Sequence, residues 1–198
     1  MSESTAVILG SLAFSFVLVL VIHIWQNRED IAKLGPLHGV PYQPPTDVYL
    51  GLRNLVLHGS REKFDLPYVS SPAEPWAVMM DWGVRTGIAT VVAFSNGNAS
   101  IYTSTGGGSI GGGQSHPMIQ SAAKNAVFVA AELAPRMQAA TSEPLPRRGE
   151  VMFYVCADAG VRTATAAEKE VRKGRHPLSK LGDAMQAVVT QYRLLSPP

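Results

Sequence analysis

The sequence predicts an α+β protein in which an N-terminal transmembrane helix precedes a five-stranded, mainly antiparallel sheet with two or three packed helices. Three observations support this prediction: an uncharged apolar run near the N-terminus, two hairpin patterns, and long segments with the apolar spacing of helices. After the apolar run, the expected order is helix, three strands, helix, two strands, helix. Strands joined by tight hairpins pair antiparallel, and amphipathic helices cover one or both faces of such a sheet.

The apolar run, "AVILGSLAFSFVLVLVIHIW", covers residues 6–25 without a formal charge. A helix of about 20 residues spans roughly 30 Å, the thickness of the hydrocarbon core of a bilayer. A cleaved signal peptide is the alternative, but the preceding "MSEST" holds no Lys or Arg and no small-residue cleavage pattern follows. A buried core helix is rarely apolar on every face. We therefore expect a short tail over residues 1–5 and a retained single-pass helix.

The charges beside this helix predict its orientation. Arg28 and Lys33 follow the run, whereas no Lys or Arg precedes it. The positive-inside rule then places the N-terminus outside the cell membrane and the C-terminal domain in the cytoplasm.

Small residues within the run are spaced four apart, as on helix faces where another membrane helix packs, although such residues are also ordinary in membrane helices. They are candidate contacts with other integral membrane subunits: Ala6, Gly10, Ser11 and Ser15.

Residues 26–45 are rich in Pro and Gly and predict an extended spacer that holds a globular domain, residues 46–198, away from the bilayer. The domain opens with a short helix that Thr46 caps and Gly59 ends. One face of this helix carries its apolar side chains: Val48, Leu52, Leu55 and Val56.

The strands follow. Residues 76–82, "WAVMMDW", predict a buried strand, and residues 87–105 predict a hairpin with a two-residue turn at Asn96-Gly97. A helix capped by Ser115 or opened by Pro117 runs to Pro135, which ends or kinks it. Residues 150–168 predict a second hairpin around Asp158 to Gly160, and a last helix starts at Pro177.

The order of elements over residues 46–195 is similar to that of the roadblock, longin and profilin group of small α/β domains. That resemblance implies binding and assembly rather than catalysis, and it rests on element order alone. The segments "MMDWG", "STGGGSIGGG" and "GRHPLS" also resemble a pattern in bacterial proteins without an assigned function.

The stretch "STGGGSIGGGQSHP", residues 104–117, matches G-x-G-x-x-G at Gly106, Gly108 and Gly111. A dinucleotide site is the alternative interpretation, but the stretch follows a hairpin strand and lacks the acidic residue about twenty positions later. We expect a turn whose bare backbone lets another chain approach, with these candidate contacts: Gly106, Gly107, Gly108, Gly111, Gly112 and Gly113.

The remaining candidates for chemistry are weaker. The five histidines show no metal-ligand spacing, so no metal site is expected; His23 fits an interfacial position near Trp25. Cys156 is the single cysteine, which excludes an internal disulfide framework. It could pair with His116 or His176 as nucleophile and base, but its strand predicts burial. No catalytic residue or cofactor is predicted.

The basic run Arg172, Lys173 and Arg175 predicts a solvated loop, or a contact with an anionic lipid surface or an acidic protein. The formal net charge of only +2 gives no basis for a nucleic-acid partner.

We expect a non-catalytic accessory or assembly subunit of a larger membrane complex, for example a photosynthetic reaction centre with its antenna or a respiratory complex. The alternative is a roadblock-like regulatory module that recruits a soluble partner to the membrane. The third hypothesis is a nucleotide-binding enzyme that uses the glycine loop.

Overall fold

The computed structural model describes residues 42–69 and 71–195. The predicted membrane helix and its candidate contacts Ala6, Gly10, Ser11 and Ser15 lie outside these residues. Among the residues described, no helix has the length and apolar character needed to cross a membrane.

The described chain folds into an α+β domain. Its helices are α3 (Asp47–Leu57), α4 (Pro117–Leu133), α5 (Glu168–Arg172) and α6 (Ser179–Leu195), with 3-10 turns η1 (Glu62–Phe64), η2 (Gly112–Gln114) and η3 (Ala134–Arg136). Its strands are β1 (Pro75–Gly83), β2 (Ile88–Phe94), β3 (Ala99–Thr103), β4 (Gly108–Ile110), β5 (Gln138–Ala139), β6 (Glu150–Ala157) and β7 (Gly160–Ala167). They form one seven-stranded antiparallel sheet in the order β4-β3-β2-β1-β6-β7-β5.

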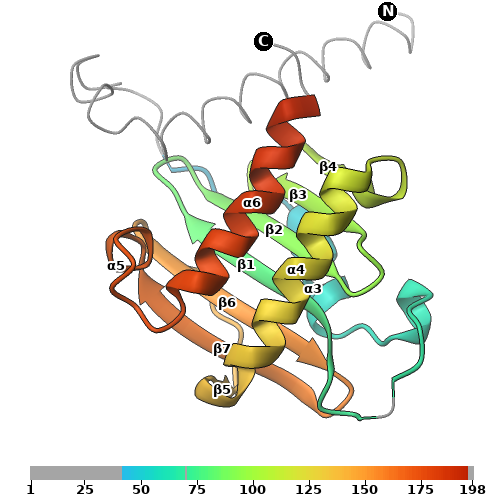
Figure 1. Cartoon of the computed structure of the whole chain (residues 1–198). Coiled ribbons are helices and arrows are strands. Elements are labelled where there is room, and N and C mark those ends of the chain that lie inside the picture. The colour runs from blue at the N-terminus through green and yellow to red at the C-terminus, as the bar shows by residue number, and fades with distance from the viewer. Residues whose placement is uncertain (1–41, 70, 196–198) are drawn as a thin grey trace, which may run out of the picture.

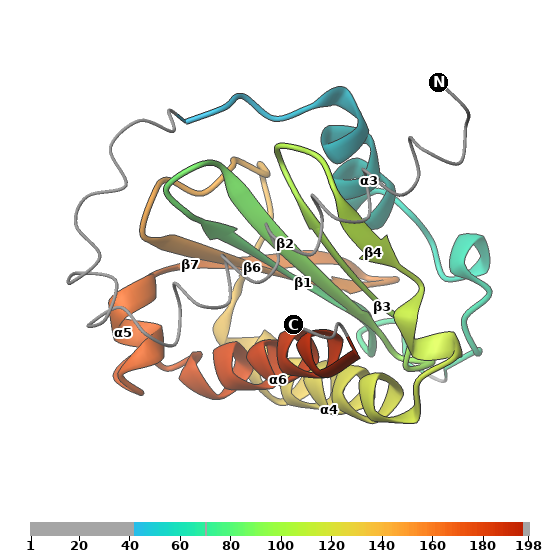
Figure 2. The ribbon, with the colours of Figure 1, turned by 90° about the horizontal axis from the view of Figure 1, so that it is seen from above.

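The domain has three layers. Helices α4 and α6 cover one face of the sheet and α3 lies on the other face (Figures 1 and 2). Side chains of β1 alternate between the two: Val78 and Met80 pack in the core beneath α4 and α6, while Ala77 and Met79 pack in the core beneath α3. Every residue of β1 is therefore buried, as expected for a strand covered on both faces.

The five predicted strands and the two long helices are confirmed. The predicted sheet was too small, however, because β4 and β5 add a short strand at each edge. The predicted two-residue turn after β2 was also too short: four residues, 95–98, lie between β2 and β3, and of these only Gly97 has a positive φ, of 90°. Such loops combine a turn with a residue in the left-handed region, where glycine is unstrained.

Two helix boundaries differ from the prediction. Helix α4 begins at Pro117 with His116 in the capping position, so Ser115 is not its cap. A short helix, α5, occupies part of the segment that was expected to be a loop. Pro135 lies just past α4, in η3, and the long helix ends before it as predicted.

Helix α3 turns an unexpected face toward the sheet. Thr46 caps it as predicted, its side chain accepting a hydrogen bond from the Tyr49 N–H at 3.3 Å. The buried face carries Tyr49 and Arg53 together with Val56 of the predicted apolar face, whereas Val48 of that predicted face is 74% exposed. The rest of the predicted apolar face of α3 thus points sideways, toward the β4 edge of the sheet, and not down onto the sheet.

We expect Gly51→Ala to raise the free energy of unfolding by about 0.5–1 kcal/mol, because glycine within a helix is less favourable than alanine by that amount. Gly51 lies inside α3, and a Cβ there would meet no described atom within 4 Å. Denaturant unfolding measures the change. Gly113→Ala is the matched control: a Cβ at Gly113 would collide with the Gly97 carbonyl, so this variant loses stability. Destabilisation by Gly51→Ala would contradict the position of Gly51 inside α3 with open space beside it.

Candidate functional site

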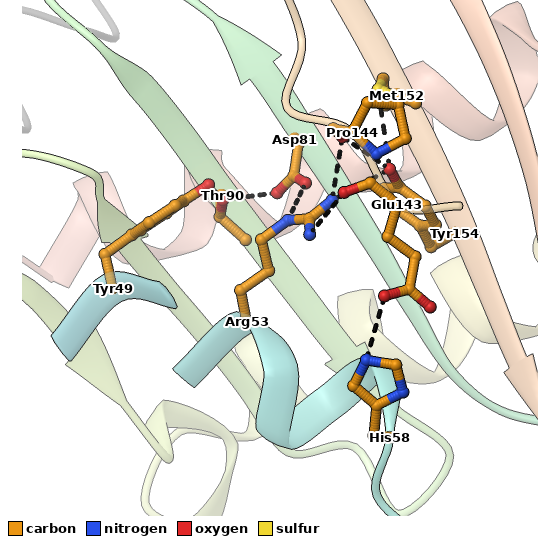
Figure 3. A network of polar contacts seen from close by, with 9 residues as sticks. All are labelled: Tyr49, Arg53, His58, Asp81, Thr90, Glu143, Pro144, Met152 and Tyr154. Atoms are coloured by element: carbon orange, nitrogen blue, oxygen red, sulfur yellow. Dashed lines mark hydrogen bonds and ion pairs between the residues drawn. The ribbon is translucent and has the colours of Figure 1, made fainter. Parts of the chain in front are cut away.

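A buried ion pair fixes α3 on the sheet. Asp81, near the C-terminal end of β1, is fully buried, and Arg53 of α3 is 3% exposed. The Arg53 Nε–H donates to Oδ2 of Asp81 at 2.8 Å, and the Thr90 hydroxyl donates to Oδ1 at 2.6 Å (Figure 3). Thr90 stands directly opposite Asp81 on β2, and its Oγ1 is also 3.0 Å from the Tyr49 hydroxyl.

The two Nη atoms of the Arg53 guanidinium bond to β6 and to the loop that precedes it. Nη1 donates to the Glu143 carbonyl at 3.0 Å, and Nη2 donates to the Pro144 carbonyl at 3.1 Å and to the Tyr154 hydroxyl at 2.9 Å. The guanidinium carbon lies 5.0 Å from the centre of the Tyr154 ring, a cation–π distance. One side chain therefore joins α3 to β1, to β6 and to the loop before β6.

The electrostatics of this network suit a structural role. Burial raises the pKa of the Asp81 carboxyl, and the charge of Arg53 and the hydrogen bond from Thr90 oppose that shift. Burial also raises the pKa of the Tyr154 hydroxyl to about 12. Both oxygens of Asp81 accept hydrogen bonds from the protein, and Arg53 supplies the counter-charge, so the burial of this carboxylate is compensated within the fold.

An apolar groove runs between α3 and the β3–β4 edge. One hollow of about 200 Å³ lies between Val48 and the glycines 106–108. A second hollow of about 110 Å³ lies between Leu55 and Ile110. Leu52, Tyr102 and Ile110 line both hollows, so the two form one groove along β4. The residues that line it include no charged side chain.

Tyr102 forms part of the wall between the groove and the buried network. The residue is 4% exposed, and its hydroxyl has no hydrogen-bond partner among the described residues. Its ring meets that of Tyr49 edge to face, with centroids 5.7 Å apart. Tyr49 and Tyr102 thus both line the groove, and the Tyr49 hydroxyl is linked to Asp81 through Thr90.

Strand β4 forms one outer edge of the sheet. Its register pairs Ile101 with Ser109, and flanking hydrogen bonds run from Gly111 N–H to the Ala99 carbonyl and from Thr103 N–H to the Gly107 carbonyl. In an antiparallel ladder with this pattern, Ser109 bonds to β3. The backbone N–H and C=O groups of the two neighbouring residues, 108 and 110, therefore point away from β3. No described backbone group bonds to them.

The structure separates the glycines of the predicted partner contact into three groups. Gly106 and Gly107 form the β3–β4 turn with φ of 97° and 86°, and Gly108 starts β4. Gly111 follows β4 with φ of 79°.

The last two glycines pack against the chain's own core. A Cβ at Gly112 would collide with the Tyr192 ring, and one at Gly113 would collide with the Gly97 backbone. The stretch is therefore a short edge strand between turns, which sequence reasoning missed, and not only a turn before a helix.

The basic candidates lie elsewhere. Arg172, Lys173 and Arg175 are exposed in and after α5. Figure 1 shows α5 and β4 toward opposite edges of the sheet, so the basic run and the glycines do not form one site.

The structure also shows where the single cysteine and the possible metal-ligating side chains lie. Cys156 is fully buried on the α3 face, as its strand predicted, and burial raises the pKa of its thiol to about 12. No group of three or more metal-ligating side chains occurs in the part of the chain that the structure describes.

The Arg53–Asp81 pair was not predicted from the sequence. One signal was present: Asp81 is the only charged residue in a strand that is otherwise apolar or aromatic apart from its terminal glycine. A lone carboxylate in a buried strand requires a partner, but its partner lies 28 residues away in sequence.

No family model, no curated protein and no solved structure matches this chain.

We expect Arg53→Met to lower the free energy of unfolding by about 3–5 kcal/mol, because it leaves the buried Asp81 carboxylate without its counter-charge. Adding Asp81→Asn to this variant should restore part of the loss, since the unpaired charge is gone while an acceptor remains for Thr90. The loss in the single variant also shrinks as the pH falls, because protonation of Asp81 removes the charge. Denaturant unfolding of the two single variants and the double variant measures the coupling, and additive losses would contradict a direct pair.

Proposed function

We propose that this chain is a single-pass, membrane-anchored accessory subunit whose α+β domain docks on neighbouring proteins of a larger membrane assembly. Residues 6–25 supply the anchor in this proposal, and the spacer after them presents the domain to its neighbours. The domain lies on the cytoplasmic side, as the flanking Arg28 and Lys33 predict.

The observation that carries the proposal is the apolar face of α3 beside the open edge of β4. Val48 and Ile110 are 74% and 64% exposed, and they flank a groove without charged lining. Exposed apolar surface next to a strand with outward backbone groups is typical of protein contacts. We name this surface, made of Val48, Leu52, Leu55, Tyr102 and residues 106–110, the docking surface.

The buried polar network favours docking over chemistry at this place. Its charged groups bond to each other and to the backbone beneath α3, whereas the groove above offers apolar side chains. A substrate in the groove would therefore meet mainly rings and aliphatic groups, beside the uncharged polar side chains of Thr46, Thr103, Asn98 and Ser100. A roadblock-like regulatory module would use the same surface, with a soluble partner in place of a membrane protein.

The test is purification of the full chain from membranes in a mild detergent, followed by native size analysis and mass spectrometry. We expect the wild-type chain to resist extraction by alkaline carbonate and to purify in an assembly that contains other integral membrane proteins. Val48→Lys would place a charge on the docking surface and should weaken the assembly by roughly tenfold or more, about 1.4 kcal/mol.

Phe128→Lys is the matched control, because Phe128 is 63% exposed on α4, on the other face of the sheet. The proposal fails if the wild-type chain is released by carbonate, or if it migrates alone as a monomer. An assembly that loses its members equally in both variants would refute the role of this surface.

A further inference from the structure

We propose that the docking surface receives a second copy of this chain, with β4 pairing antiparallel to β4 of the second copy across a two-fold axis at Ser109. This inference rests on the docking role proposed above and names the neighbour that fills the surface. It would join the two sheets into one continuous sheet.

The backbone of β4 is self-complementary in this arrangement. With Ser109 on the axis, residue 108 of each copy stands opposite residue 110 of the other. The N–H and C=O groups of these two residues point outward, so each pair exchanges two hydrogen bonds and the contact gains about four. A strand at a sheet edge that lacks charged residues and proline offers no obstacle to such pairing, and residues 105–114 contain neither.

The side chains are complementary as well. Ile110 lies on the α3 face of the sheet, since it is paired with Ser100 and lines the groove with Leu52 and Tyr102. Across the axis it would stand opposite Gly108, in a hydrogen-bonded pair whose Cα atoms are about 5.5 Å apart. Gly108 and its two preceding glycines line the hollow of about 200 Å³ beside Val48. The exposed Ile110 of one copy thus meets the hollow that the glycines leave open in the other.

The charge pattern favours a second copy over a different protein. A two-fold contact brings the same surface of both copies together, so a surface with charges of one sign would repel itself. The groove lining carries no charge that would select an oppositely charged partner. Two copies of an uncharged surface that carries both a projecting isoleucine and a matching hollow are complementary to each other.

The contact is small, because β4 has only three residues. We therefore expect weak association in dilute solution and stronger association at the membrane, where anchored copies share a high local concentration.

The test is disulfide trapping of the full chain in membranes. Ser109 would face Ser109 of the second copy in a pair without mutual hydrogen bonds, where Cα atoms are about 4.5 Å apart. That distance lies within the range of about 4.4–6.8 Å that a disulfide requires. We expect Ser109→Cys to form a covalent dimer under mild oxidation. Cys156, the single natural cysteine, is fully buried and does not compete.

Two matched variants sharpen the result. Phe128→Cys, exposed on α4, reports random collisions at the same protein density and should cross-link at least tenfold more slowly. Ile110→Lys added to Ser109→Cys should reduce cross-linking to that background. The low reactivity of Cys156 toward a thiol reagent shows that each variant is still folded.

Cross-linking of Ser109→Cys at the rate of Phe128→Cys would overturn the inference, as would cross-linking that Ile110→Lys leaves unchanged. A monomeric chain whose docking surface is filled by another protein, or by its own residues 1–41, would give the first of these results. A different result would contradict the proposed function. That function requires other membrane proteins in the purified assembly, whereas the inference requires only the covalent dimer of this chain.

Discussion

The ion pair between Arg53 and Asp81 is the constraint on which the rest of this structure depends. A carboxylate in the centre of a covered sheet is stable there only with a counter-charge and further hydrogen bonds. Arg53 supplies the counter-charge and one hydrogen bond, and Thr90 supplies the other. To reach Asp81, Arg53 must occupy the buried face of α3. The helix is therefore rotated so that part of its apolar face remains outside. A buried polar contact thus places apolar side chains on the surface.

The second feature is the use of glycine at the sheet edge. Gly106 and Gly107 allow the chain to turn at positive φ, and Gly108 starts a strand beside the groove. These three glycines line the groove next to α3 and add no side chain to it. Gly112 and Gly113 have a different role, since they let the chain pack closely on Tyr192 and on the turn at Gly97. The same stretch therefore forms a core contact at one end and an open edge at the other.

Local patterns in the sequence were sufficient for much of the fold. The hairpin at Asn96-Gly97 and the hairpin at Asp158 to Gly160 were found because turn residues separate strands that are adjacent in sequence. Strand β4 was missed because glycine has a low strand propensity, and its pairing is decided by contact with β3 rather than by its own residues.

The orientation of α3 was missed for a similar reason. Helical spacing identified an apolar face but could not show that Asp81, distant in sequence, would draw Arg53 inward.

Amide hydrogen exchange in the full, membrane-bound chain is the most direct test that the docking surface is an interface. The N–H groups of Gly108 and Ile110 point outward from the sheet edge, whereas that of Ser109 bonds to β3 and serves as the internal reference. We expect the two outward amides to exchange slowly in the wild-type chain and to become fast in Val48→Lys, with Ser109 protected in both. Fast exchange at both outward amides in the wild-type chain would contradict this account.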